Sequence, residues 1–327
     1  MHHRFIKSKG LVFVLFMVLV LFSSHWVLAG DYPTKPVKLI VPSGAGSASD
    51  LIMRAVTSVA ADYLGQPIVV QLKPGGGGAI GSNYVANAKP DGYTLLAGAS
   101  TWNTGLHAIE KRSKGPEDYE VVCRVNYSPT IIAVKPDAPF KTFKDMIAWA
   151  KANPGNLTVG TPGPWSPPDV VWKYLTKEVG IEARVIPFQG GGKMTAALLG
   201  GHIMVGHAIP SMAMNFVGTG KLRFLVILNE KRLPGLPDVP TSQEVGLNPR
   251  INSFGSAWRG ILAPKGTPQS VVEKVDMAFK QMTESKTVKR MFSRLGEQTH
   301  YLGSDAFPGV WAAEYAAYQE IGKMYKK

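Results

Sequence analysis

The chain has 327 residues and a formal net charge of +13, with 36 Lys and Arg residues against 23 Asp and Glu residues. Its length suits two domains of ordinary size, and its single cysteine, Cys123, excludes an intramolecular disulfide. We expect Cys123 to be a buried small apolar residue, because it stands in the apolar run 121–125. Lys and Arg are scattered along the chain, so dispersed surface charge or attraction of small anions explains the charge better than nucleic-acid binding.

Residues 1–29 have the pattern of a secretory signal peptide. A basic start precedes the apolar run Leu11–Phe22, and Val27–Ala29 offers short side chains where a signal peptidase cleaves. The alternative is a membrane anchor, but this run is short of the roughly 20 apolar residues that a span needs. We therefore expect cleavage and export. The leader holds three basic and no acidic residues, so the mature chain from Gly30 carries 13 − 3 = +10.

Short apolar runs alternate with amphipathic stretches along the mature chain. In chain order, the pattern predicts strands at 37–41, 67–72, 93–97, 130–134, 157–160, 183–187, 202–207 and 224–228. It predicts helices between them at 50–63, 143–151, 168–179 and 192–199. The last part differs, with a strand at 256–262 and then helices at 268–285, 286–295 and 305–323. This alternation predicts an α/β fold with mainly parallel sheets flanked by helices, and no internal repeat is apparent.

The distribution of these elements predicts two lobes. Residues 131–255 contain enough strand–helix units for a sheet of their own, whereas residues 256–327 do not. We therefore expect lobe 1 to comprise 30–130 plus 256–327, and lobe 2 to comprise 131–255. In such sheets, ligands bind at the carboxyl ends of strands beside helix N-termini, which places a binding cleft between the lobes.

The glycine-rich segments do not fit nucleotide-binding motifs. Gly44 and Gly46 match the first two glycines of GxGxxG, but Ser49 stands where the third belongs. The segment 190–195 reads GGGKMT, and Met194 occupies the position where a P-loop needs Ser or Thr. No HExxH or CxxC spacing occurs either. We therefore expect no cofactor and no metal.

Enzymatic activity has weak support in the sequence. No GxSxG motif is present, and nothing in the sequence ties a loop serine to a histidine. A secreted serine hydrolase stays open as an alternative, with Ser211 or Ser100 as nucleophile and His107 or His207 as base. We expect a binding protein without catalytic activity.

Four loops rich in Gly, Ser, Thr and Pro are the candidate binding segments, at 43–50, 75–81, 98–103 and 161–166. Backbone N–H groups and hydroxyls at helix starts bind a carboxylate without burying a cation. Asp50 either caps its helix, as Ser47-x-x-Asp50 suggests, or faces a ligand donor. Trp102 and Trp165 either line the cleft or pack in the interior. The candidate ligand-binding residues are Ser43, Gly44, Ala45, Gly46, Ser47, Asp50, Ser100, Trp102, Thr161, Trp165, Ser166, Asp169, Gln189 and Ser211.

Long stretches of the sequence resemble one known family. The stretches include YPTKPVKLIVPSGAGSASD, LGQPIVVQLKPGGGGAIGSNYVANAKPDGYTLLAG and WRGILAPKGTP. Over nearly the whole mature chain, they are similar to Bug-type periplasmic substrate-binding receptors of tripartite tricarboxylate transporters. The resemblance implies a two-lobe Venus-flytrap fold, type II-like, that closes on a small carboxylate in the periplasm. It also implies delivery to inner-membrane transporter subunits; a sensor as the partner is a further alternative. We expect a monomer that does not bind nucleic acid.

The resemblance also implies roles for particular loops. The family's first loop falls on 43–50, where backbone groups and ordered waters hold one ligand carboxylate, and loops of the second lobe fall on 161–169 and 209–211. The chain departs from the family in having Asp169 where a histidine is common, a Trp at 165, and Met204 in place of an aspartate. These departures favour a larger, partly apolar or aromatic carboxylic acid over citrate.

Overall fold

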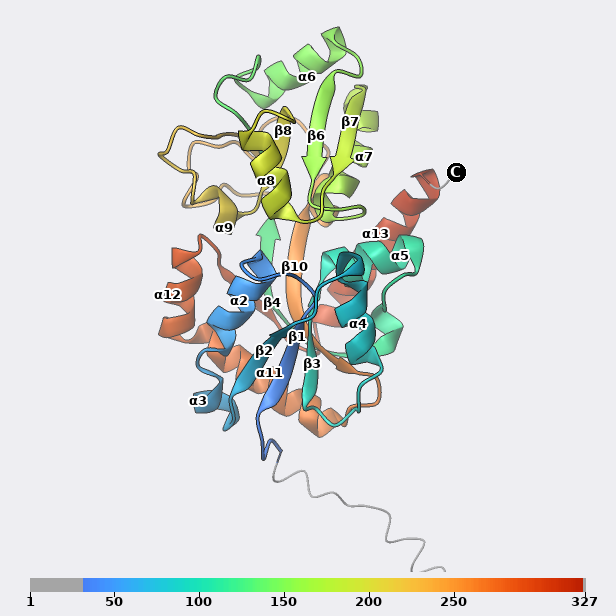
Figure 1. Cartoon of the computed structure of the whole chain (residues 1–327), viewed down its shortest axis with the longest axis vertical. Helices are drawn as coiled ribbons and strands as arrows, with labels where there is room; N and C mark the ends of the chain where they lie inside the picture. The colour runs from blue at the N-terminus through green and yellow to red at the C-terminus, as the bar shows by residue number, and fades with distance from the viewer. Residues whose placement is uncertain (1–31, 326–327) are drawn as a thin grey trace, which may run out of the picture.

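A computed structural model describes residues 32–325, so the predicted signal peptide lies outside the described residues. Figure 1 shows two α/β lobes, one above the other, each built on a sheet with helices on its faces. The prediction of a two-lobe α/β fold is confirmed. Between residues 32 and 325, no helix is both long enough and apolar enough to cross a bilayer.

The lower lobe in Figure 1 contains a six-stranded sheet in the order β11-β4-β10-β3-β1-β2. Its strands are β1 (Val37–Val41), β2 (Ile68–Leu72), β3 (Thr94–Ala99), β4 (Tyr119–Pro129), β10 (Ser256–Pro264) and β11 (Thr299–Leu302). β1 is parallel to β2 and β3, whereas β10 is antiparallel to β3 and β4, and β11 is antiparallel to β4. The expectation of a mainly parallel sheet is therefore corrected. β10 returns from the upper lobe and so runs against its neighbours.

Helices cover both faces of this sheet, and the sheet separates two apolar cores. They are α2 (Ala48–Thr57), α3 (Ala60–Leu64), α4 (Ala79–Ala86), α5 (Leu106–Glu110), α11 (Gln269–Glu284), α12 (Lys286–Arg294) and α13 (Phe307–Tyr325), with short turns η1 (Gly76–Gly78), η2 (Ser100–Gly105) and η3 (Pro116–Asp118). The helix predicted at 50–63 is two helices, because Val59 leaves the helical region at φ −111° and ψ 15°. Leu39 and Phe279 belong to one core, and Trp258 and Trp311 belong to the other.

The upper lobe contains a five-stranded sheet in the order β7-β6-β8-β5-β9. Its strands are β5 (Ile131–Val134), β6 (Leu157–Thr161), β7 (Ala183–Pro187), β8 (Val205–Ala208) and β9 (Arg223–Ile227), and its helices are α6 (Phe143–Ala152), α7 (Pro167–Val179), α8 (Gly191–Leu199), α9 (Pro210–Ala213) and α10 (Ile251–Phe254). β6 is parallel to β7 and β8, and β5 is antiparallel to β8 and β9. This sheet is also mixed.

The chain crosses between the sheets twice, and the two crossings lie together. The amide of Thr130, between β4 and β5, donates to the carbonyl of Gly255, between α10 and β10, at 2.9 Å. α13 extends past this point and contacts the upper lobe, where Tyr318 and Ile321 join its apolar core. The proposed lobes, 30–130 plus 256–327 and 131–255, therefore share α13 as a common element.

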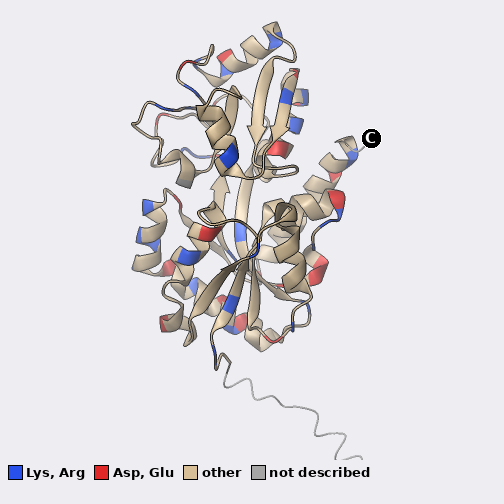
Figure 2. Cartoon of the chain, viewed as in Figure 1, with Lys and Arg blue, Asp and Glu red and all other residues tan. Residues whose placement is uncertain are grey.

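The basic residues are spread over the surface of both lobes, as Figure 2 shows. α12 is the clearest local concentration, since its four basic residues, Lys286, Lys289, Arg290 and Arg294, are all exposed. Cys123 is fully buried in β4, as expected, and burial raises the pKa of its thiol. The thiol is therefore an interior packing group.

Candidate ligand cleft between the lobes

The tip of the turn between β1 and α2 is exposed to solvent. Gly44, Ala45 and Gly46 are exposed, and a Cβ added at either glycine would meet no atom within 4 Å. The next two amides belong to Ala48 and Ser49, the first residues of α2, and they donate no hydrogen bond to any part of the chain that the structure describes. Unsatisfied amides at the positive end of a helix bind anions. This turn can therefore hold a carboxylate.

The polar side chains of this first turn satisfy one another. The Ser47 hydroxyl accepts the Asp50 amide at 3.3 Å and lies 2.7 Å from the Ser43 hydroxyl. The Asp50 carboxylate accepts hydrogen bonds from the Gly46 amide at 2.9 Å and from Arg54 Nε at 2.7 Å, and the residue is only 4% exposed. These contacts support the capping interpretation of Asp50 over a role in ligand binding.

The turn between β6 and α7 repeats this arrangement in the upper lobe. Both helices follow a serine with nearly the same backbone angles, φ −67° and ψ 157° at Ser47 and φ −64° and ψ 157° at Ser166. Asp169 stands three positions after its serine, as Asp50 does, and accepts the Trp165 amide at 2.9 Å. Although no internal repeat is apparent in the sequence, the two lobes share one turn design.

The second turn differs from the first in the groups that it presents. Pro167 and Pro168 occupy the first two positions of α7, and proline has no N–H group to donate. Trp165 takes a left-handed backbone conformation at φ 57°, and its indole N–H donates to Glu110 of the lower lobe at 2.6 Å. The second turn therefore contacts the other lobe instead of offering amides to an anion.

The other polar groups of the second turn are also occupied. The Asp169 carboxylate is 2% exposed and accepts from the Lys173 ammonium at 2.6 Å and from the Thr161 hydroxyl at 3.3 Å. The Ser166 hydroxyl donates to the Gly163 carbonyl at 2.7 Å. These predicted site residues maintain the shape of the turn.

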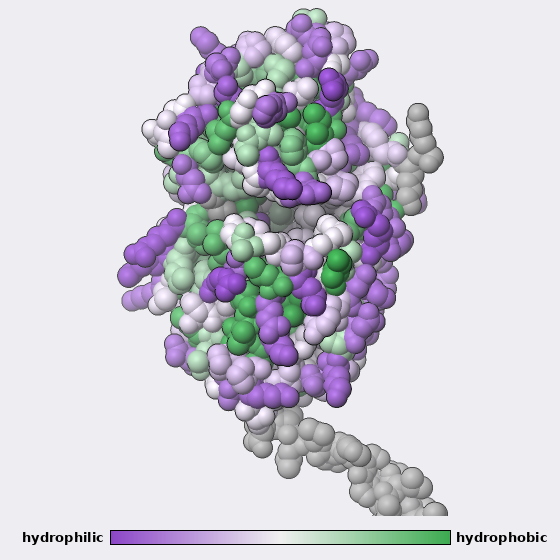
Figure 3. Space-filling model, viewed as in Figure 1, coloured by the Kyte–Doolittle hydropathy of each residue, from purple (hydrophilic) through white to green (hydrophobic). Residues whose placement is uncertain are grey.

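The two lobes touch at two glycines of the lower lobe, with a hollow between the lobes visible in Figure 3. A Cβ added at Gly105, at the end of η2, would lie 2.1 Å from the Trp165 carbonyl oxygen. A Cβ added at Gly296, after α12, would lie 2.2 Å from Met214 and 2.9 Å from the Pro210 carbonyl oxygen. The absence of side chains at both glycines allows the lobes to approach this closely.

Two further predicted site residues, Ser100 and Trp102, are also buried. Ser100 is fully buried, and its hydroxyl accepts the Trp258 amide at 3.0 Å. Trp102 packs on Gly78, where an added Cβ would lie 2.8 Å from its side chain, and its indole donates to the Ala97 carbonyl at 3.3 Å. The structure therefore favours the packing interpretation of Trp102.

The remaining candidates follow the other strands of the upper sheet. Gln189 is exposed between β7 and α8, and its side-chain oxygen accepts from Lys193 at 2.7 Å. The amides of Gly191 and Gly192, at the start of α8, have no acceptor among the described residues. Ser211 lies in α9, after β8. The upper lobe therefore has donors at α8 but none at the first two positions of α7.

Neither buried histidine pairs with a serine among the described side chains. His207 Nε2 lies 2.5 Å from the indole N–H of Trp172, and Nδ1 lies 2.8 Å from the Gly160 carbonyl oxygen. The ring is therefore neutral with its proton on Nδ1, and burial lowers the pKa of His207 to about 4. Both nitrogens are occupied, so His207 has no position free to activate a hydroxyl.

His107 belongs to a small polar group beside η3. Its Nδ1 lies 3.0 Å from the Tyr315 hydroxyl, and its Nε2 lies 3.2 Å from Glu117. His107, Glu117 and Asp118 lie close enough together to hold a metal ion, but Asp118 is paired with Lys114 at 3.0 Å. Each of these groups has a protein partner, so we assign no ion to them.

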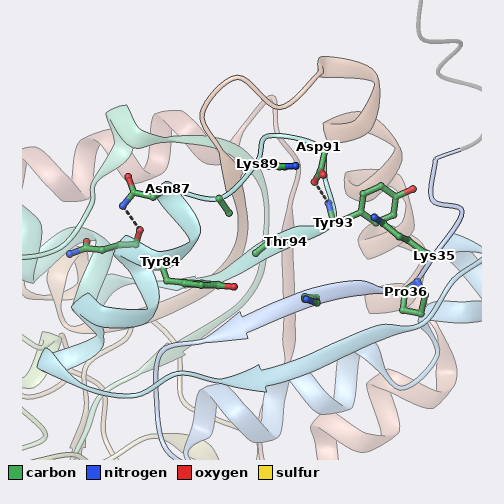
Figure 4. A pocket seen from close by; sticks show the side chains of 11 residues that line it. Lys35, Pro36, Tyr84, Asn87, Lys89, Asp91, Tyr93 and Thr94 are labelled. Carbon is green, nitrogen blue, oxygen red and sulfur yellow. Dashed lines mark hydrogen bonds between the residues drawn. The ribbon is translucent and has the colours of Figure 1, made fainter.

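A surface hollow of about 830 Å³ lies on the lower lobe, lined by residues of α4 and by residues at the starts of β1 and β3. Figure 4 shows Lys35, Tyr84, Lys89 and Tyr93 around it, and every lining residue is at least partly exposed. The Lys35 ammonium lies 4.5 Å from the centre of the Tyr93 ring. A ligand here would stay in contact with water, so the gap between the lobes is the better candidate site.

Comparison with known proteins agrees with this geometry. Residues 52–307 match the family described as the tripartite tricarboxylate transporter family receptor. The chain belongs to this family. Among its relatives, the UPF0065 protein in the gbd 5′ region of Cupriavidus necator is 32% identical over 289 residues, covering 88% of this chain and 85% of the relative. Protein BugT of Bordetella pertussis is 30% identical over 273 residues and covers 83% of each chain. The resemblance to Bug-type receptors is confirmed.

Solved structures of similar proteins have the same fold. A periplasmic transporter structure superposes with a TM-score of 0.81 at 31% identity, covering 89% of this receptor and 97% of that chain. MatC from Rhodopseudomonas palustris, solved with bound malate, superposes with a TM-score of 0.78 at 26% identity, covering 89% and 100%. The receptor fold is therefore shared over nearly the whole described chain.

Proposed function

We propose that this receptor captures a small organic carboxylic acid between its lobes in the periplasm and delivers it to the inner-membrane subunits of a tripartite transporter. The observation that carries the proposal is the open start of α2, where two unused amides meet an exposed glycine turn. The bound malate of the related MatC structure supports the same ligand class. We infer that the protein acts by binding alone, because His207 has no free nitrogen and His107 pairs with Tyr315 and Glu117.

Capture requires contacts from both lobes. A ligand shifts the lobes toward the closed form only by binding that form better than the open one. The α2 turn would hold the carboxylate, and the start of α8 and the Trp165 turn would contact the rest of the molecule. The apolar surface of Trp165 is consistent with a ligand that is partly apolar or aromatic.

The test compares carboxylic acids with their primary amides. The mature protein is unfolded and refolded to remove any ligand carried through purification, and binding is measured by thermal shift and calorimetry. The panel contains malate, adipate, hexanoate and benzoate, and each acid is matched by its uncharged amide. We expect at least one acid to bind and its amide to bind at least about tenfold more weakly, because an ionised acceptor strengthens each hydrogen bond. Failure of the whole panel, extended to acidic and aromatic amino acids, would contradict the proposal.

A further inference from the structure

A buried cation lies beside the α2 turn. Arg259 lies on β10, where it pairs with Ala99 of β3 and Asn126 of β4, and it is only 5% exposed. Its Nε lies 3.3 Å from the hydroxyl of Ser49, the second residue of α2. The guanidinium is thus in contact with the helix start whose amides are unused.

Part of the guanidinium is fixed by the protein. Nη1 donates to Asn126 Oδ1 at 2.8 Å and to the Ser128 hydroxyl at 2.9 Å. Both residues then donate to the buried Glu297 carboxylate, Ser128 at 2.5 Å and Asn126 at 3.0 Å. Glu297 therefore balances the charge of Arg259 through two bridging side chains, which hold the guanidinium in one orientation.

The other side of the guanidinium is unused. Nη2 donates no hydrogen bond to the described residues, and protein atoms do not enclose it completely. It therefore keeps some accessible surface, although the residue as a whole is nine-tenths buried. Water can accept from this nitrogen while the cleft is open, whereas a closed cleft requires an acceptor from the ligand, since a buried donor without one is costly.

We propose that Arg259 is a ligand-binding residue whose Nη2 pairs with the ligand carboxylate at the start of α2. This inference rests on the proposed function. It adds a fixed positive charge to the main-chain donors of Ala48 and Ser49, where the sequence predicted binding without a buried cation. Two amides and a guanidinium edge together suit the two oxygens of one ionised carboxylate.

The charge gives the receptor a basis for selecting acids. An ionised carboxylate gains an ion pair with Arg259, which the uncharged amide cannot form. The carbonyl oxygen of the amide can still accept from Nη2, but this neutral hydrogen bond is weaker than the charge-assisted one. Part of the discrimination between acid and amide therefore depends on this side chain.

The test separates binding from folding with a double variant. Arg259→Gln alone removes a positive charge that the buried Glu297 carboxylate interacts with through Asn126 and Ser128, and we expect its melting temperature to fall. Arg259→Gln combined with Glu297→Gln removes both charges but keeps side chains that hydrogen bond to Asn126 and Ser128, so it should recover a melting temperature close to that of the natural protein. Binding is measured by calorimetry with the acid of the panel that the natural protein binds best, and with its amide.

We expect the double variant to bind this acid about 10- to 100-fold more weakly, as the loss of a charge-assisted hydrogen bond predicts, and to lose much less affinity for the amide. Arg124→Gln is the matched control, because Arg124 lies on β4 of the same sheet and donates to the His300 carbonyl instead. It should keep the acid affinity within about twofold.

The outcomes separate the two proposals. If the double variant folds and binds the acid as tightly as the natural protein, Arg259 is structural and the inference is overturned, while the proposed function stands. If Arg124→Gln weakens binding equally, the effect is one of net charge and the inference is also overturned. If the natural protein binds no acid of the panel, the proposed function fails and the inference fails with it.

Discussion

The turns before α2 and α7 have similar backbone conformations, but they present different groups to the space between the lobes. Each places a serine at the helix start and an aspartate that accepts an amide of its own turn, and each aspartate pairs with a basic residue one helical turn later. The two turns differ in the groups that they expose. The lower turn exposes glycines and unused amides, whereas the upper turn has two prolines and a tryptophan that reaches Glu110.

We infer from this difference that the two turns have separate roles, although their backbone shape is the same. The lower turn keeps the donors that an anion needs, and Arg259 adds charge beside them. The upper turn has exchanged donors for contacts with the opposite lobe, at Gly105 and at Glu110. A common backbone shape therefore does not imply a shared binding role, because the shape depends on the capping residues and the binding depends on which amides remain free.

The largest expected effect is a loss of stability at the turn before α7 when the pH falls. His207 supports this turn through the Gly160 carbonyl, and burial lowers its pKa from 6.5 to about 4. Because the folded-state pKa is depressed, the stabilisation is present above pH 6.5 and is lost progressively as the pH falls from 6.5 through 4. The loss from this group is about 3 kcal/mol in the free energy of unfolding, at 1.36 kcal/mol per pKa unit.

Chemical denaturation at pH 7 and pH 4 measures this loss, and hydrogen exchange locates it. We expect His207→Gln to lose about 3 kcal/mol less than the natural protein over this pH range. Exchange should rise first at 160–170, before it rises at 41–50. An equal loss in both proteins would show that His207 does not carry the effect.

The next largest expected effect is a loss of ligand affinity when the contact between the lobes at Gly105 is disturbed. In Gly105→Ala, the added Cβ would lie 2.1 Å from the Trp165 carbonyl, while the backbone angles of φ −61° and ψ −55° suit alanine. The lobes must therefore separate, and we expect ligand binding to lose about 2 to 3 kcal/mol, as for overpacked interfaces. Calorimetry measures the affinity and small-angle scattering measures the separation.

Gly309→Ala is the control for this change. Gly309 lies in α13, and a Cβ added there meets no atom within 4 Å. It should leave both the affinity and the separation unchanged. Normal binding by Gly105→Ala would mean that the lobes do not meet at Gly105 when the ligand is bound.

A proline at the first position of α2, as at the first position of α7, should weaken binding of the acid by about 2 kcal/mol. Ala48→Pro removes the first free amide of α2, and proline suits this position because Ser47 is extended at ψ 157°. We expect the affinity for the best acid to fall about 10- to 100-fold, since a charge-assisted hydrogen bond is lost, while the melting temperature changes little.

Gln269→Pro is the matched change at another helix start. Gln269 is the first residue of α11, is exposed, and follows an extended residue. It should bind the acid normally. If Ala48→Pro also binds normally, the amide of residue 48 is not a ligand donor.

The smallest effect concerns the indole contact across the lobes. Trp165→Phe keeps an aromatic ring near the Lys173 ammonium, which lies 4.8 Å from the ring centre, but removes the N–H bond to Glu110. We expect binding to weaken by about 1 kcal/mol, because the closed form loses one hydrogen bond to a partly exposed carboxylate. Trp149→Phe, on α6, is the control. Equal affinities for all three proteins would show that the contact does not stabilise closure.

Much of the fold was predictable because its signals are local. The alternation of apolar runs placed most strands within two residues of their observed bounds, and Gly65 ends α3 in the left-handed conformation that glycine favours. β4 and β11 were missed, and the break at Val59 left no pattern in the sequence. At the site, the sequence left Asp50 open between a helix cap and a ligand contact, and its contacts favour the cap. Ser100 and Trp102 were predicted as ligand-binding residues, but both are buried in the structure.

The sequence by itself determined the order of the elements, the chemistry of the turns and the receptor family, because caps, prolines and apolar periodicity act over a few neighbouring residues. Only the tertiary structure decided which of these groups meet. Arg259 reaches Ser49 across 210 positions, and Gly105 meets Trp165 from the opposite lobe. Such contacts depend on how β10 returns between β3 and β4 and on how the lobes close, and no local preference of the chain encodes either arrangement.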